Sequence, residues 1–496
     1  MKFHVSPTYP KNLDALVLHV AKGQRPLPPA TLEADKKLKG FLRKEIAAAK
    51  FKGDLGQTLV VHNHDARALP VRKVILAGLG AESIEPEAIR KSIAAAVQQA
   101  QSCHMTRLAR PVPDGRRLDP ETVSRAIAEG ALLGSYRFTK HKSEDKTAAL
   151  SLTLVGGGAP VRRKVTAGLR QGQAAAEAQI LARDLANEPP SHLTPKQFAK
   201  EARTVSRKNG LGISVLGPAE IRRAGLGALL AVARGSDEPP QFIKLTYRPR
   251  KTGRGTQKHI VLVGKSITYD SGGLNLKPSR GGMLEEMKLD MSGGAAVLGA
   301  MSALKRLGVK HKVTGYLPAT ENLLGGSAYK PGDVVRIYNG KTIEVGNTDA
   351  EGRLTLADAL AYSTDRDKPD EIIDLATLTA TDISLGPAYA AIFASQPRME
   401  ARFKEAGEHV GEKVWPLPFP EEYDEMTKSA VADFSNIVSG RAYTLSGPLL
   451  LKHFVGKVPW VHLDIGGPAI AGKDSGYTRK GGSGFGARLL LEYLSD

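Results

Sequence analysis

The 496-residue sequence has a single cysteine, Cys103, which excludes an internal disulfide. It also lacks any run of about 20 apolar residues, the length that a membrane-spanning helix requires. Its apolar stretches are short, as at residues 93–97 and 260–263. The first 20 residues show no basic segment followed by an apolar core and a small-residue cleavage site, so we expect no signal peptide. These absences predict a cytoplasmic protein with no membrane partner.

Acidic residues are few relative to basic ones, with 51 Asp and Glu against 70 Lys and Arg and a net charge of +19. Residues 1–175 hold 29 basic and 15 acidic side chains, and so carry most of the excess. A basic region can attract nucleic acid or another polyanion. A solvated basic surface is the favoured alternative, because no arginine-rich arm or aromatic-interleaved basic patch accompanies the charge.

The length predicts two to four domains, and 41% hydrophobic with 24% charged residues is typical of globular proteins. Within residues 1–160, β-rich runs alternate with helical patterns, which predicts a smaller N-terminal α/β domain. Residues 161–188 form a connecting long helix that ends before a Pro-Pro pair. Residues 189–496 form a larger α/β domain with a mixed central sheet, expected to be the catalytic one.

Two segments of this larger domain, residues 263–296 and 345–360, place acidic residues in glycine-rich loops after apolar strands. In α/β sheets, ligands bind where strands end in such loops. The candidate site residues are the four carboxylates Asp270, Asp290, Asp349 and Glu351.

Four carboxylates at the ends of neighbouring strands would repel one another, and two divalent cations would neutralise them. Carboxylate oxygens suit Mg²⁺ or Mn²⁺, and Zn²⁺ also accepts oxygen and nitrogen ligands. The alternative is that each acid only caps the helix that follows it. Helix capping does not explain why Lys265, Lys277 and Arg353 occupy the same loops.

The sequence resembles the leucyl aminopeptidase family, also called the cytosol aminopeptidases. The family signature N-T-D-A-E-G-R-L stands unbroken at 347–354, and G-K-x-I-T-[FY]-D-S-G-G begins at residue 264. Similarity continues through DLANEPPSHLTP (184–195), DLATLT (374–379) and PWVHLDIGGPA (459–469), and so covers nearly all of residues 180–496. The first 160 residues match weakly.

The resemblance implies a two-metal peptidase with Mn²⁺ or Zn²⁺. In this family pattern, Asp270 and Glu351 would bridge both ions, and Asp349 would complete one site. Asp290 and the neutral amine of Lys265 would complete the other, which requires the lysine pKa to fall well below its usual value of about 10.4.

The resemblance also implies the catalytic roles. Lys277 would stay charged and polarise the substrate carbonyl, while Arg353 would hold a bicarbonate ion that shuttles a proton. The free α-amine of the peptide would bind the metal that Lys265 ligates, which confines cleavage to the N-terminus. Family members assemble as hexamers, so a homo-hexamer is expected here.

The same resemblance places the side-chain pocket for a Leu-like residue at Met287, Thr377, Leu378 and Ala380. Several positions depart from the family pattern near this pocket, and they bear on the preference for Leu and not on peptidase activity. The departures are Ser266, a two-residue extension at 280–282, Ala380, Tyr443 and the pair 447–448.

The sequence therefore predicts a metal-dependent aminopeptidase that releases N-terminal amino acids from peptides. The alternative is a DNA-binding protein with secondary peptidase activity, acting through its basic N-terminal domain. A scaffold with an inactive site is a third reading, and the intact set of seven polar site residues argues against it.

Overall fold

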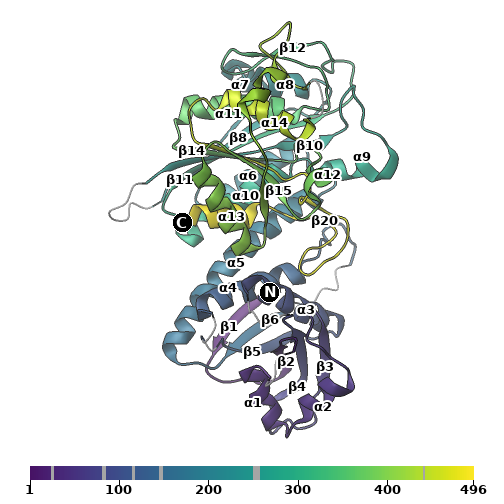
Figure 1. The fold of residues 1–496 in the computed structure, drawn as a ribbon, viewed down its shortest axis with the longest axis vertical. Coiled ribbons are helices and arrows are strands. Elements are labelled where there is room, and N and C mark those ends of the chain that lie inside the picture. The colour runs from purple at the N-terminus through teal and green to yellow at the C-terminus, as the bar shows by residue number, and fades with distance from the viewer. Residues whose placement is uncertain are drawn as a thin grey trace. The chain divides into compact units, whose positions relative to one another are not determined.

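The computed structural model describes residues 1–23, 27–80, 85–113, 115, 118–144, 149–249, 257–438 and 442–495. The chain divides into two compact units, shown in Figure 1: residues 1–177 with 473–479, and residues 178–472 with 480–496. The division falls within α5 (Ala159–Asn187), in the region where the sequence predicted a long connecting helix. The short segment 473–479 joins the first unit, which no pattern in the sequence indicated.

In the described part of the first unit, six strands form a sheet in the order β1-β6-β5-β2-β4-β3. Neighbouring strands are parallel except for β3, which runs antiparallel to β4. The strands are β1 (Lys2–Ser6), β2 (Leu13–Val20), β3 (Thr58–His62), β4 (Val71–Gly78), β5 (Arg107–Pro111) and β6 (Ser151–Val155).

Both faces of this sheet are buried, as is usual for parallel strands. Along β2, alternate side chains enter different clusters: Ala15 and Val17 join one core and Leu16 and Leu18 join the other. The first core contains α3 (Pro86–Ser102) and α4 (Pro120–Ser135), and the second contains α1 (Pro29–Lys37) and α2 (Phe41–Ala48).

The strand order reverses at β2. After β4 on one side of β2, the chain passes through α3 and returns as β5 on the other side. Such a reversal leaves a crevice outside the carboxyl ends of the strands, which is where open α/β sheets bind ligands.

In the described part of the second unit, a larger sheet has the order β16-β15-β18-β14-β9-β11-β8-β7, with β10 paired to β11. Strands β18, β14, β9 and β11 are parallel at its centre, while β8 and β15 are antiparallel to their inner neighbours. The prediction of a mixed sheet is confirmed. The strands are β7 (Gly212–Leu216), β8 (Gln241–Tyr247), β9 (His259–Gly264), β10 (Ser266–Asp270), β11 (Lys312–Asn322), β14 (Glu371–Ala376), β15 (Ala390–Ala394), β16 (Val414–Pro416) and β18 (Trp460–Asp464).

Helices α10 (Ser292–Leu307) and α11 (Gly352–Asp367) both contact β9, and each begins beside one of the predicted acidic loops. A hairpin is formed by β12 (Val334–Arg336) and β13 (Thr342–Glu344), which are antiparallel. Among the described helices, none has the length and apolarity needed to cross a bilayer. The other helices of eight or more residues in the described part of this unit are α6 (Pro195–Asn209), α13 (Pro397–Val410), α14 (Tyr443–Leu451) and α15 (Ala487–Ser495).

Candidate active site

The two acidic loops meet at the carboxyl edge of the larger sheet. Lys265 lies between β9 and β10, and Asp270 is the last residue of β10. Asp290 lies two residues before α10, and Glu351 is the N-cap of α11. Lys265 and Asp270 stand at ends of strands of this sheet, whereas Asp290 and Glu351 come to the same edge at the starts of α10 and α11, two helices that contact β9.

Glycine permits the close approach that this arrangement needs. A Cβ on Gly352, at the start of α11, would lie 2.5 Å from Cε of Lys265. Gly272 has φ of +88°, and a Cβ there would lie 2.4 Å from the carbonyl oxygen of Asn275 and 2.8 Å from Oδ1 of Asp349. Side chains at these positions would push the charged groups apart.

The first half of the site is centred on the buried ammonium of Lys265. Its Nζ lies 2.8 Å from Oδ1 of Asp290 and 2.9 Å from Oε1 of Glu351, and it donates a 2.9 Å hydrogen bond to the carbonyl oxygen of Thr377. Burial alone would lower the pKa of Lys265, but the Asp290 and Glu351 carboxylates outweigh it and raise the pKa. Without cations, this lysine is therefore protonated.

The second half is centred on Lys277, which lies in the loop after β10. Its Nζ is 2.8 Å from Oδ2 of Asp270 and 2.5 Å from Oδ1 of Asp349. Burial opposes its charge, but the adjacent carboxylates raise its pKa. Its side chain is 12% exposed, so the ammonium can reach a bound molecule.

The cluster has an excess of negative charge that points to cations. Four carboxylates face two ammonium groups, and oxygens of Asp270, Asp349 and Glu351 lie within 4.8 Å of one another. Oδ2 of Asp290 and Oε2 of Glu351 are buried and have no hydrogen-bond partner within the part of the chain that the structure describes. Buried anionic oxygens are costly unless a proton or a metal ion compensates them, so this donor set fits divalent cations that prefer oxygen ligands.

The pKa values of the acids show the same imbalance. Burial, reinforced by Glu351, raises the pKa of Asp270 to about 7. Burial also raises the pKa of Asp290 and Asp349. Glu351 alone shifts downward, because Lys265 and Lys277 outweigh its desolvation. Three of the four acids thus resist ionisation until more positive charge arrives.

Asn322, which the sequence did not single out, and Thr377, which it assigned to the side-chain pocket, hold two of these acids in place. Oδ1 of Asp270 accepts 2.8 Å hydrogen bonds from the amide of Gly272 and from Nδ2 of Asn322. Oγ1 of Thr377 donates to Oδ1 of Asp290 over 2.7 Å. The signal for Asn322 was its place at the end of the buried strand β11, where a polar side chain meets the ligand edge of the sheet.

Arg353 lies in the first turn of α11 and is 3% exposed. Its Nη1 donates to the carbonyl oxygen of Asn436 over 2.8 Å and to Oγ of Ser446 over 3.0 Å. Its Nε has no hydrogen-bond partner, and burial lowers the pKa of the guanidinium. This leaves a buried donor with capacity for an added acceptor.

The four residues predicted for the side-chain pocket take different positions. Leu378 is half-buried and approaches α14 so closely that a Cβ on Gly447 would lie 2.4 Å from its Cδ2. Met287 is half-buried in a short 3-10 helix (Met287–Leu289), and Ala380 is half-buried at the N-cap of α12 (Thr381–Leu385). Only Thr377 hydrogen-bonds to the charged cluster among the described contacts of these four.

An α/β domain with a mixed sheet and a cluster of acids and lysines at the carboxyl edge of that sheet is typical of a metal-dependent enzyme. The sequence profile "Cytosol aminopeptidase family, catalytic domain" matches residues 180–491, and the profile of the family's N-terminal domain matches residues 17–145. The chain belongs to the cytosol aminopeptidase family. It is a metal-dependent aminopeptidase, a peptide hydrolase, as the sequence predicted.

The similarity to known proteins covers most or all of the chain. A probable cytosol aminopeptidase of Roseiflexus castenholzii is 44% identical over 91% of this chain and 92% of its own, and one from Cyanothece sp. is 39% identical over 97% and 96%. Among solved structures, the bottromycin maturation enzyme BotP in complex with Mn is 36% identical, with a TM-score of 0.84 over 97% of this chain and 99% of its own. A mutant of tomato leucine aminopeptidase is 32% identical, with a TM-score of 0.86 over 100% and 96%.

Proposed function

We propose that this aminopeptidase uses two divalent cations per subunit to release N-terminal, Leu-like residues from peptides. Asp270, Asp290, Asp349 and Glu351 would hold the ions together with the amine of Lys265. The observation that carries the proposal is the pair of buried carboxylate oxygens, on Asp290 and Glu351, that lack a partner. The Mn complex of BotP favours Mn²⁺ as one ion used here, with Zn²⁺ as the alternative.

When bound, two such ions would acidify a water molecule and polarise the scissile carbonyl. The residues of the chain do the remaining work. Lys277 stays protonated, because the carboxylates around it raise its pKa. Once cations compensate Asp270 and Asp349, the Lys277 ammonium is free to donate to the oxyanion that develops on the substrate.

Lys265 has a different role, because it is buried against Asp290 and Glu351 with 5% of its side chain exposed. To act as a ligand it must lose the proton that these two carboxylates stabilise. Added positive charge at the cluster would reverse that stabilisation and lower the pKa of Lys265. We therefore assign Lys265 to cation binding and Lys277 to the substrate.

Arg353 is proposed to hold a bicarbonate ion as the proton carrier. Its buried guanidinium has an Nε with no hydrogen-bond partner among the described residues, and Arg353 lies in the first turn of the helix whose N-cap is Glu351. A small anion there would satisfy that donor and place a basic oxygen near the cluster. Bicarbonate-free assays of wild type and Arg353→Ala test this role, since the variant should lose any stimulation by added bicarbonate.

The substrate pocket would be formed by Met287, Thr377, Leu378 and Ala380. Gly447 of α14 approaches Leu378 closely, so α14 would form one wall of this pocket. We further propose a homo-hexamer in the cytosol, the compartment for which the relatives are named. Light scattering that gave a monomer mass would contradict the assembly.

The deciding experiment is a count of metal ions with and without activity. The protein is chelated, reloaded with Mn²⁺ or Zn²⁺, and examined by native mass spectrometry and by hydrolysis of leucine anilide. We expect two ions per subunit and activity that returns with the second ion. Full turnover by the chelated, metal-free protein would overturn the proposal.

A further inference from the structure

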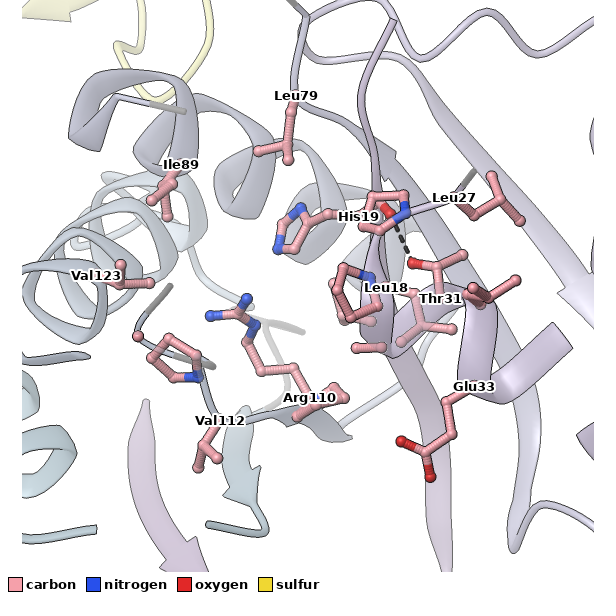
Figure 2. Close-up of a pocket in the computed structure, with 18 of the residues that line it drawn as sticks. Leu18, His19, Leu27, Thr31, Glu33, Leu79, Ile89, Arg110, Val112 and Val123 are labelled. Atoms are coloured by element: carbon pink, nitrogen blue, oxygen red, sulfur yellow. Dashed lines mark hydrogen bonds between the residues drawn. The ribbon is translucent and has the colours of Figure 1, made fainter. Parts of the chain in front are cut away.

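The N-terminal unit contains a cavity of about 720 Å³ outside the carboxyl ends of β2 and β5, drawn in Figure 2. It therefore lies where the strand order of this sheet reverses, which is the ligand position of open α/β folds. Most of its wall is apolar, and its volume is in the usual range for small-molecule sites. The apolar lining includes Val17, Leu79, Ile89, Val112 and Val123.

One buried cation lines this apolar wall. Arg110, near the end of β5, is 9% exposed, and neither its Nε nor its Nη1 has a hydrogen-bond partner among the described residues. Burial lowers the pKa of its guanidinium to about 10. By contrast, Arg90 in the same unit is 2% exposed and lies 2.5 Å from the carboxylate of Glu129.

His19, near the end of β2, lines the same cavity. Figure 2 shows its ring and the guanidinium of Arg110 turned toward the same space. Nδ1 of His19 lies 3.0 Å from Oγ of Ser92, while its buried Nε2 has no partner among the residues whose structure is described. Burial, with the charge of Arg110, lowers the pKa of His19 well below its usual value, so the ring is neutral. If the Ser92 hydroxyl donates to Nδ1, Nε2 carries the proton and is a second donor.

Among the described residues that line the cavity, the one acid, Glu33, does not compensate Arg110. Glu33, on α1, has a side chain that is 69% exposed and lies 2.8 Å from Nζ of Lys37. Lys36 also lines the cavity, so the part of the lining that the structure describes carries a net positive charge. A buried charge with no partner is costly, and a ligand of opposite charge removes that cost.

We propose that this cavity binds a small organic anion, a carboxylate or a phosphate monoester with an apolar body. Its acidic group would accept hydrogen bonds from Arg110 and His19, and its apolar part would contact the wall formed by β2, β5, α3 and α4. All of the residues concerned belong to the first unit, whereas the metal cluster belongs to the second. The proposal therefore does not depend on the peptidase chemistry.

The test is calorimetric titration of the full-length, metal-loaded protein with three probes of similar size. These are phenyl phosphate, 4-phenylbutyrate and the uncharged 4-phenylbutanol. A charge-assisted contact predicts that at least one anion binds about tenfold or more tightly than the alcohol. The stronger of the two anions identifies phosphate or carboxylate as the preferred group. Equal affinity of all three probes, or no binding of either anion up to about 10 mM, would overturn the proposal.

Variants locate the binding to the cavity. Arg110→Met should weaken the preferred anion by about tenfold or more and leave hydrolysis of leucine anilide unchanged. Arg107→Met is the matched control, because Arg107 is on the same strand but its side chain is 54% exposed. It should bind the anion as the wild type does, and wild-type affinity in Arg110→Met would refute the site.

Thermal unfolding without a probe separates binding from folding. If Arg110 is uncompensated, replacing it with the apolar Met should leave the melting temperature unchanged or raise it. A marked fall in melting temperature would mean that Arg110 stabilises the empty domain, which contradicts the proposal.

Discussion

The acidic cluster of the catalytic unit and the cavity of the N-terminal unit differ in the charge of the buried side chains whose atoms lack a partner among the described residues. In the catalytic unit these include carboxylate oxygens of Asp290 and Glu351, and in the N-terminal unit they include nitrogens of His19 and Arg110. Each set lies at the carboxyl edge of a sheet with parallel strands at its centre. The first set calls for cations and the second for an anion.

This comparison separates functional from structural charges. Arg90 and Glu129 are both buried, but they neutralise each other and their ion pair is a feature of the core. Asp374 likewise accepts from Nε1 of Trp460 and contacts Nδ1 of His462, both at 2.6 Å. Burial of a charge is therefore a weak indicator of a site, and a buried charge with unsatisfied atoms is a stronger one.

The largest expected effect comes from removing an acid of the cluster that is proposed to bind cations. Glu351→Ala removes the acid assigned to both ions, so we expect activity to fall below about one thousandth of wild type, with loss of bound metal. Activity on leucine anilide and metal content by mass spectrometry are measured together. Asp365→Ala, at an exposed acid in the same helix, is the control and should retain both. Two retained ions in Glu351→Ala would contradict its assigned role.

The next effect distinguishes the two lysines. Lys277→Ala should lower kcat by about 10²–10³, the usual effect of losing one stabiliser of an oxyanion, while the metal content stays near wild type. Lys265→Ala should instead lose metal, because its nitrogen is assigned as a ligand. Titration of Mn²⁺ into each chelated variant checks this, and equal metal affinities of the two variants would show that the roles are wrongly assigned.

The third effect is on stability and follows from the raised pKa of Asp270, about 7 against about 3.9 when unfolded. Between these values the native state binds more protons than the unfolded state, so the free energy of unfolding falls as pH rises. Metal-free wild type should thus lose on the order of 3 kcal/mol from this group between pH 4 and 7.

Asp270→Asn isolates that effect, because the amide cannot ionise. In urea unfolding of metal-free protein, the variant should exceed wild type in stability at pH 7 and approach it near pH 4. In metal-loaded wild type, the cations compensate the charge and the pH dependence should flatten. A stability difference that stayed constant over this pH range would count against the raised pKa.

The sequence predicted the acids and lysines of the cluster because they lie in two short glycine-rich segments after strands. It did not predict their partners, since these come from distant positions. Asn322 bonds to Asp270 across 52 residues, and Thr377 bonds to Asp290 across 87. Arg110 does not stand out in the sequence among many basic residues, because only the tertiary structure shows that none of the described acids pairs with its buried guanidinium. The assignment of residues 473–479 to the first unit could not be predicted either, because it depends on tertiary contacts.

The smallest expected effect concerns the basic charge of residues 1–175, which hold 29 basic and 15 acidic side chains. An excess of this kind attracts DNA through the release of counterions, with a slope of about −0.9 per phosphate contact. We expect binding that is weak, independent of sequence and lost near 150 mM salt, where the screening length is about 8 Å.

A competition shift assay with genomic fragments against random DNA, at rising salt, measures this. Arg110→Met distinguishes DNA binding from small-anion binding, because a buried guanidinium inside a cavity cannot contact a duplex. The variant should bind DNA as the wild type does while losing the small anion. Enrichment of particular fragments at physiological salt would instead establish sequence-specific recognition by the basic N-terminal domain. Loss of DNA binding in Arg110→Met would mean that the duplex and the small anion both depend on Arg110. It would contradict the expectation that DNA binds only to exposed basic side chains.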